Sequence, residues 1–205
     1  LYSAALEERV MPATLVDESA FTAANGWSPG NSGGNAGGPI TLRDALAKSS
    51  NLVSVRVLQH TGTQRARDWL GRFGLDVAKQ PDNLTLALGT GQVTPLQMAR
   101  AYATLANGGW SIEPVVIEKI TDAQGKTLFE APPAPVLTDD NRAIPARNAF
   151  VMNSLLGDVT RIGTAARAQT RLKRSDIYGK TGTTNDVLDA WFAGYHPSVA
   201  VVVWL

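Results

Sequence analysis

The residues best suited to chemistry lie near the C-terminal end, where Tyr178–Thr183 reads YGKTGT. A lysine, two threonines and a glycine lie together in a segment that otherwise has the pattern of a strand. Thr181 and Thr183 are two residues apart, so on a strand their hydroxyls share one face, and Gly182 has no side chain that would keep a ligand's backbone away. Lys180 adds a positive charge. These groups suit a substrate with a carboxylate and a peptide-like edge.

The closest competing motif is a phosphate-binding loop, because Gly179-Lys180-Thr181 supplies its last three residues. That loop requires a glycine five residues before Gly179, and Arg174 stands there. The sequence therefore argues against a nucleotide site. Taken alone, the lysine-threonine-glycine stretch is more often a hydroxyl-rich edge strand before a hairpin.

A second motif, at residues 26–30, has the form Gly-x-Ser-x-Gly around Ser28. A nucleophile elbow of this form needs a strand before it, a helix after it and a backbone N–H on the residue that follows the serine. Pro29 has no N–H, and glycines and asparagines follow where the helix should begin. We interpret the match as accidental. A serine hydrolase that pairs Ser28 with His60 or His196 stays open as an alternative.

A third candidate is the polar junction Ser49-Ser50-Asn51 between two expected helices. Residues 41–44 have the form of a helix start and predict a helix that runs to Ser49, with Leu42, Leu46 and Ser49 on one face. Asn51 is expected to cap the next helix, over residues 52–60. On its own, this junction is most often a helix connection with one capping residue.

The elements around these motifs predict an α+β fold. Helices are expected over 1–8, 64–73, 95–107 and 148–160, and a hairpin over 115–130. The apolar residues of the helix over 148–160 are Phe150, Leu155 and Val159.

Three strands follow, at Tyr178–Thr183, 190–195 and 199–205, and their short turns favour an antiparallel meander. Helices first and clustered strands last predict a sheet covered by helices. The glycine-rich segment 25–39 is expected to be a mobile surface loop with Trp27 as its anchor.

Composition limits the possible functions. The chain has 205 residues, of which 44% are apolar, enough for a proper core. Its 19 basic and 18 acidic residues are scattered, which argues against a nucleic-acid partner. There is no cysteine, and neither His60, His196 nor the Asp139-Asp140 pair has a partner at metal-ligand spacing. Gly89-x-Gly91 lacks the third glycine of a dinucleotide site, so no cofactor is expected.

The weak signals at Ser49-Ser50-Asn51 and Lys180-Thr181-Gly182 become specific when they are paired in order. They match the second and third of the signatures Ser-x-x-Lys, Ser-x-Asn and Lys-Thr-Gly of penicillin-binding proteins and β-lactamases. Four stretches resemble the transpeptidase domain of class A penicillin-binding proteins, and the resemblance covers essentially the whole chain. They are Pro39–Ser49, Leu88–Ala99, Ala101–Gly109 and Gly179–Asp186.

This resemblance implies the penicilloyl-serine transferase fold and the cross-linking of peptidoglycan. In that reaction a serine attacks the penultimate D-alanyl carbonyl of a stem peptide, terminal D-alanine leaves, and an amine of a neighbouring stem takes the acyl group. β-Lactams resemble the D-alanyl-D-alanine end and acylate the same serine. The resemblance also implies a cell-wall and cell-shape role in the periplasm, in a protein whose inner-membrane anchor lies outside this chain.

By the same resemblance, each candidate residue has an expected role. Ser49 relays a proton, Asn51 binds the peptide edge of the substrate and Lys180 supplies electrostatic support. Thr181 and Thr183 hold the terminal carboxylate, and the Thr183 N–H completes the oxyanion hole.

The first signature of the family, Ser-x-x-Lys, is missing. None of the lysines has a serine three residues before it, and Lys173, preceded by Thr170, comes nearest. We therefore expect residues 1–205 to be a partial domain, cut at both ends, whose nucleophile lies upstream of Leu1. The chain alone should be inactive and the intact protein active. Two alternatives stay open: a serine β-lactamase, and a catalytically inert binding or assembly module of the same fold.

Overall fold

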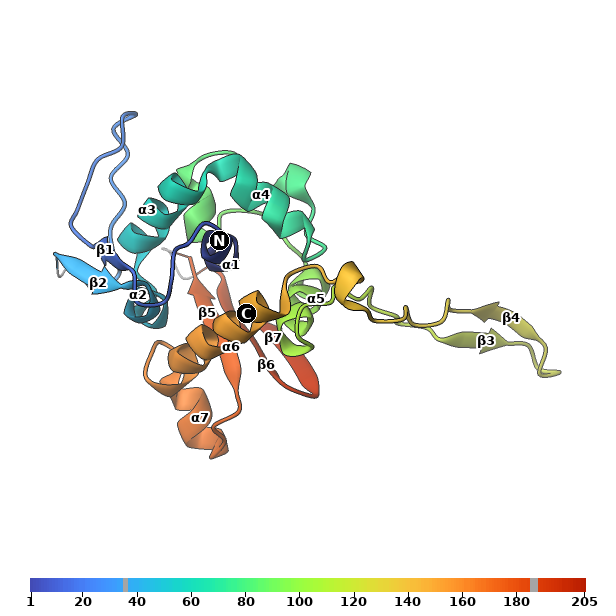
Figure 1. The fold of residues 1–205 in the computed structure, drawn as a ribbon. Helices are drawn as coiled ribbons and strands as arrows, with labels where there is room; N and C mark the ends of the chain where they lie inside the picture. Colours follow the sequence, from blue (N-terminus) through green and yellow to red (C-terminus); the bar gives the residue numbers. More distant parts are fainter. Residues whose placement is uncertain (35–36, 185–187) are drawn as a thin grey trace.

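The computed structural model describes residues 1–34, 37–184 and 188–205, so Asn185 and Asp186, at the end of one resembling stretch, lie outside the described residues. A three-stranded antiparallel sheet lies at the centre, in the order β5-β6-β7 (Figure 1). The three strands follow one another in the sequence, as the predicted meander requires, and α5 and α6 pack on them. Their bounds are β5 (Tyr178–Thr183), β6 (Ala190–His196) and β7 (Val199–Trp204).

The predicted helices form, and each begins and ends within a few residues of its predicted bounds. The helices are α1 (Tyr2–Glu7), α2 (Leu42–Lys48), α3 (Asn51–Thr61), α4 (Thr63–Gly71), α5 (Pro95–Ala106), α6 (Ala146–Arg161) and α7 (Ala166–Leu172). Single 3-10 turns occupy Val77–Lys79, Leu84–Leu88 and Asp139–Asn141. Helix α7 was not predicted, and neither was the short ribbon of β1 (Leu15–Asp17) with β2 (Pro39–Thr41).

Side-chain caps explain where two of the helices begin. Thr94 and Gln97 form a reciprocal capping box at the start of α5, as the sequence predicts. At α3 the prediction was wrong by one residue, because Ser50 rather than Asn51 is the N-cap and accepts the Val53 N–H at 3.3 Å. Asn51 is therefore the first helical residue, and its side chain is free of the capping role.

An aromatic cluster holds β5 against the helices. Tyr178 of β5 stacks on Tyr195 of β6 with ring centroids 5.3 Å apart, and Tyr102 of α5 meets Tyr195 edge-on at 6.2 Å. A Cβ on Gly157 of α6 would come 3.4 Å from the Tyr178 ring, so helix and strand approach closely. Stacked and edge-on aromatic pairs each add about 0.5–1.5 kcal/mol beyond the burial of their area. The cluster thus fixes the strand that carries Lys180.

The buried face of α6 matches the predicted apolar residues only in part. Leu155 and Val159 are fully buried, but Phe150 is 75% exposed, and Ala149, Met152 and Leu156, which were not predicted, are buried. The buried positions of α6 include Asn148, Met152 and Leu155, and Phe150 lies between them on the opposite side of the helix.

The predicted hairpin forms an arm that extends away from the rest of the chain (Figure 1). Its strands are β3 (Lys119–Thr121) and β4 (Thr127–Glu130). The first is shorter than expected, because residues 115–118 lie outside the strand, whereas the second has the expected length and lies one residue later. Ile120 and Phe129 of the arm are both exposed. In the described ranges, no helix has both the length and the apolar composition needed to cross a bilayer.

The orientation of α6 can be tested with a matched pair of truncations. Leu155→Ala should lower the free energy of unfolding by about 2–5 kcal/mol, because it empties a fully buried position. Phe150→Ala should change the free energy by less than about 0.5 kcal/mol, because the ring is already in solvent. Urea denaturation measures both values. Equal losses would mean that α6 is rotated from the orientation described.

Candidate active site

The helix junction and the distant strand meet at one point. The Lys180 ammonium donates a hydrogen bond to the Ser49 hydroxyl at 2.8 Å and another to the Thr181 carbonyl at 2.9 Å. Ser49 follows α2, and Lys180 lies in the middle of β5, 131 residues later. Two motifs that are weak alone in the sequence are thus in direct contact.

Ser49 reaches Lys180 because the chain turns sharply at the end of α2. Ser49 has a left-handed backbone, with φ 59° and ψ 45°, and its N–H bonds back to the Leu46 carbonyl at 3.1 Å. The Ser50 N–H bonds back to Ala45 at 2.8 Å in the same way. A residue other than glycine pays on the order of 1–2 kcal/mol for this conformation. The turn leaves Ser49 exposed to solvent, with its hydroxyl directed at Lys180 of β5, whereas Ser50 is buried.

Lys180 carries a positive charge that is partly removed from water. Burial lowers the pKa of the Lys180 ammonium to about 8, because desolvation disfavours the charged form. Its hydrogen-bond partners are the neutral oxygens of Ser49 and Thr181, and in the described ranges no carboxylate forms an ion pair with it. At neutral pH the ammonium is still mostly protonated. An anionic ligand would therefore find a positive charge that no described acidic side chain compensates.

Asn51 is held by the segment before β2 rather than by Lys180. Its side-chain amide donates to the Gly30 carbonyl at 2.7 Å. The Asn31 side-chain oxygen in turn accepts the backbone N–H groups of Asn51, at 2.8 Å, and Leu52, at 3.2 Å. Asn31 also donates to the buried Glu18 carboxylate at 3.0 Å. The structure thus brings together Ser49 and Lys180 but records no contact between Asn51 and Lys180 in the described residues.

The same contacts give the glycine-rich segment an anchor that the sequence did not predict. Trp27, its predicted anchor, is half-buried, and Asn31 also holds the segment by accepting the first N–H groups of α3 from outside the helix. No periodic pattern connects Asn31 to a helix start twenty residues later, so the sequence carried no signal for this contact.

The two threonines of β5 differ in their surroundings. The Thr181 hydroxyl lies 2.7 Å from the hydroxyl of Thr164, a residue in the connection between α6 and α7. Thr183 is exposed at the end of β5, opposite Ala190. Sequence reasoning missed Thr164, because nothing in its local pattern points to a strand 17 residues away.

Gly182 has open space around it. A Cβ there would meet only the Trp191 Cβ, at 3.6 Å, which is an ordinary contact. In the described part of the chain, nothing requires a glycine at this position. Strand β5 is also the edge strand of its sheet, so its outer backbone groups can pair with an extended peptide. Both features suit a ligand whose backbone lies along β5.

Ser28 does not form the alternative hydrolase site. Its hydroxyl bonds with Thr22 at 2.7 Å, and no strand precedes it directly and no helix follows it. Within the described ranges, its hydroxyl has no hydrogen bond to His60 or His196.

His196 belongs to a different group, at the turn between β6 and β7. Its ring nitrogens contact the Ser198 hydroxyl and the Asp176 carboxylate, each at 2.9 Å. Arg174 also binds Asp176 and holds the pKa of that carboxyl well below its usual range. The charge of Asp176 is thus balanced by the guanidinium, and we interpret the group as a surface ion pair that ties strand ends together.

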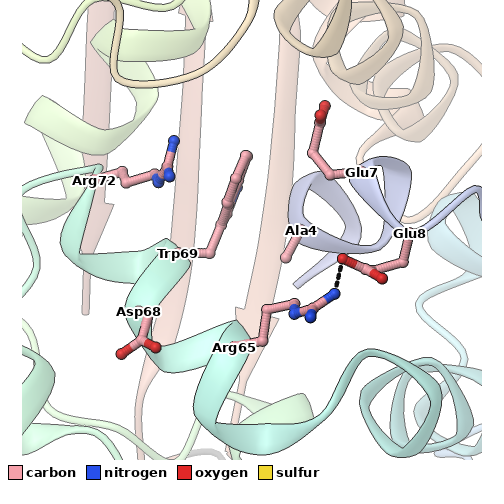
Figure 2. A pocket seen from close by; sticks show the side chains of 7 residues that line it. All are labelled: Ala4, Glu7, Glu8, Arg65, Asp68, Trp69 and Arg72. Carbon is pink, nitrogen blue, oxygen red and sulfur yellow. Dashed lines mark ion pairs between the residues drawn. The ribbon is translucent and has the colours of Figure 1, made fainter.

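A small pocket of about 250 Å³ lies between α1 and α4 (Figure 2). The Trp69 ring forms one wall, and Arg72 lies over that ring at 4.5 Å. Figure 2 also shows an ion pair between Arg65 and Glu8 at its rim. None of the candidate residues of β5 or the α2–α3 junction lines this pocket.

Comparison with known proteins gives consistent matches. Residues 1–205 match the family model described as penicillin binding protein transpeptidase domain. Penicillin-binding protein 1A of Neisseria lactamica is 42% identical over 100% of this chain and 26% of its own length. The protein of the same name from Pseudomonas aeruginosa is 36% identical over 100% of this chain and 31% of its own length. The chain therefore spans between a quarter and a third of these relatives.

The fold of the chain also matches solved structures. Penicillin-binding protein 1A from Haemophilus influenzae has a TM-score of 0.91 and 32% identity, over 99% of this chain and 36% of that one. PonA1 from Mycobacterium tuberculosis, in complex with penicillin V, has a TM-score of 0.78 and 28% identity, over 98% of this chain and 56% of that one. These structures confirm the predicted fold.

The left-handed backbone of Ser49 gives a stability prediction. Ser49→Gly should be as stable as Ser49→Ala or up to about 1 kcal/mol more stable, because glycine adopts a positive φ without a steric penalty. At the neighbouring helical residue Lys48 the order should reverse, and Lys48→Gly should be about 1 kcal/mol less stable than Lys48→Ala. Urea unfolding of the four variants measures this. Alanine being better at both positions would contradict the described backbone.

Proposed function

Because this chain belongs to the penicillin-binding protein transpeptidase family, we propose that it forms the substrate-binding wall of a peptidoglycan D,D-transpeptidase. The observation that carries the proposal is the contact between Lys180 and Ser49, which joins two of the family's signatures in one site. Thr181, beside Lys180 on the edge strand β5, adds a hydroxyl for the carboxylate end of the donor peptide.

In this proposal the acyl donor lies along β5, with its terminal carboxylate at Thr181 and Thr183. Lys180 keeps a positive charge near that anion, and the outer edge of β5 pairs with the peptide backbone. Gly182 leaves room for this approach. Asn51 has a second amide proton and an amide oxygen, which suit the C=O and N–H of a peptide unit.

The reaction itself needs a serine nucleophile, which we place in the longer protein, since this chain has no Ser-x-x-Lys. The serine oxygen bonds to the penultimate D-alanyl carbonyl carbon, and the bond from that carbon to the nitrogen of the last D-alanine breaks. The proton that the serine hydroxyl loses is passed to the leaving nitrogen, relayed by Ser49 while Lys180 holds the Ser49 hydroxyl in place. An amine of a second stem peptide then attacks the acyl-serine and restores the hydroxyl.

We further propose that β-lactams acylate the same serine, because they present a carboxylate and a strained amide to the same groups. Two observations support this: the family match, and the solved relative PonA1 in complex with penicillin V. By the same resemblance, we propose that the domain lies in the periplasm. It would belong to a protein that is held in the inner membrane by a segment outside this chain.

Labelling of the intact protein with fluorescent penicillin tests the function. The wild type should form a stable covalent adduct. Lys180→Ala should slow adduct formation by about 10- to 150-fold, because a hydrogen bond to a charged group contributes about 1.5–3 kcal/mol. Lys173→Ala, which removes an exposed lysine at the end of α7, is the matched control and should not change the rate.

The outcomes of this labelling separate the alternatives. Rapid release of the label would identify a β-lactamase, and a wild type without adduct would identify an inert module. An unchanged rate in Lys180→Ala would remove that lysine from the proposed mechanism.

The pH profile of the same reaction tests the charge of Lys180. Because burial places its pKa at about 8, the ammonium is present below pH 8 and is lost as the pH rises through that value. The acylation rate for a penicillin with a free carboxylate should therefore fall above pH 8. In Lys180→Arg the side chain stays charged, so the fall should move to higher pH. If the profile is the same in both proteins, another group causes the decline.

A further inference from the structure

We propose that Thr164 is a positioning residue of the transpeptidase site, which orients the Thr181 hydroxyl so that its proton points to the carboxylate of the donor. The inference rests on the proposed function and adds a residue from a third segment of the chain. Thr164 lies outside the signatures Ser-x-Asn and Lys-Thr-Gly.

The geometry of the two hydroxyls carries the argument. The oxygens of Thr164 and Thr181 are 2.7 Å apart, the usual length of a hydrogen bond between hydroxyls. Each hydroxyl has one proton and can accept two hydrogen bonds, so one of the two donates to the other. Only the arrangement in which Thr164 donates leaves the Thr181 proton for a ligand.

A carboxylate selects that arrangement. An ionised carboxylate only accepts hydrogen bonds, so its approach turns the Thr181 proton toward it. Thr164 then donates to the Thr181 oxygen and the two hydroxyls form a chain that ends at the anion. Because hydrogen bonds in such a chain polarise one another, Thr164 strengthens the bond from Thr181 to the carboxylate without touching the ligand.

The backbone around Thr164 fixes its place. The Thr164 N–H donates to the carbonyl of Ala47 at 3.1 Å, in the last turn of α2. A Cβ on the preceding residue, Gly163, would lie 2.2 Å from that same carbonyl oxygen. The connection after α6 is therefore pressed against the end of α2, two residues before Ser49. One helix terminus places both Ser49 against Lys180 and Thr164 against Thr181.

The Thr164 side chain contributes little to the stability of the fold. It is exposed, and the bond to Ala47 uses the backbone N–H, which any side chain except proline retains. Thr164→Val keeps the shape and removes the hydroxyl, whereas Thr164→Ser keeps the hydroxyl. Thr170→Val is a matched control, because within the described ranges its exposed hydroxyl bonds only to the Ala166 carbonyl of its own helix.

The test compares two probes on the intact protein: a penicillin with a free carboxylate and the methyl ester of the same penicillin. The second-order rate of acylation is measured for each, and the ratio of acid to ester is the readout. Thr164→Val should lower the rate with the acid about tenfold and the rate with the ester less than twofold, so the ratio falls. Thr164→Ser should restore the ratio, and Thr170→Val should match the wild type with both probes. The loss with the acid should lie in the apparent dissociation constant rather than in the limiting rate.

Three results would overturn the proposal. An equal loss with acid and ester, or a serine variant as slow as the valine variant, would show that Thr164 only supports the structure. A valine variant whose rates with both probes equal those of the wild type would show that Thr181 needs no orientation by Thr164. A wild type that forms no adduct with the acid would instead refute the proposed function, and the role of Thr164 with it.

Discussion

The site depends on an ammonium group that is partly removed from water and that, among the described residues, hydrogen-bonds to neutral oxygens. Lys180 donates two of its three protons to a hydroxyl and a carbonyl, which leaves its charge in place. Desolvation of that charge is unfavourable, and it lowers the pKa. A carboxylate of the chain at this point would stabilise the lysine and neutralise its charge. Among the described residues no carboxylate pairs with it, so under the proposed function the carboxylate of a ligand would be its counter-ion.

Rigid neighbours keep the ammonium in this position. The tyrosine cluster joins β5 to β6 and β6 to α5, and α6 packs directly on β5. The left-handed turn at Ser49 ends α2 and turns its hydroxyl toward the strand. The connection that carries Thr164 rests on the same end of α2. The strained left-handed backbone of Ser49 persists because the surrounding contacts hold it in that conformation, which is typical of residues at functional sites.

Sequence patterns predicted the elements better than the contacts between them. The capping box at Thr94 and the alternation of the late strands depend on neighbouring residues, so they could be identified from the chain alone. The cap of α3 was wrong by one position, because Ser50 and Asn51 are both good capping residues and only the turn at Ser49 decides between them. Phe150 was misplaced because it was grouped with the other apolar residues by type, although five residues separate it from Leu155, which places it about 140° away around the helix. The contact of Lys180 with Ser49 was inferred from the order of two motifs, whereas the contacts of Asn31 and Thr164 join distant segments that share no motif.

The close approach of Gly163 to Ala47 limits how this site can evolve. Because a Cβ at Gly163 would overlap the Ala47 carbonyl, the backbone after α6 is held in one position and cannot shift to suit a different ligand. Under the proposed function, a change in ligand preference would then have to come from the side chains that project from this backbone rather than from a shift of the backbone itself.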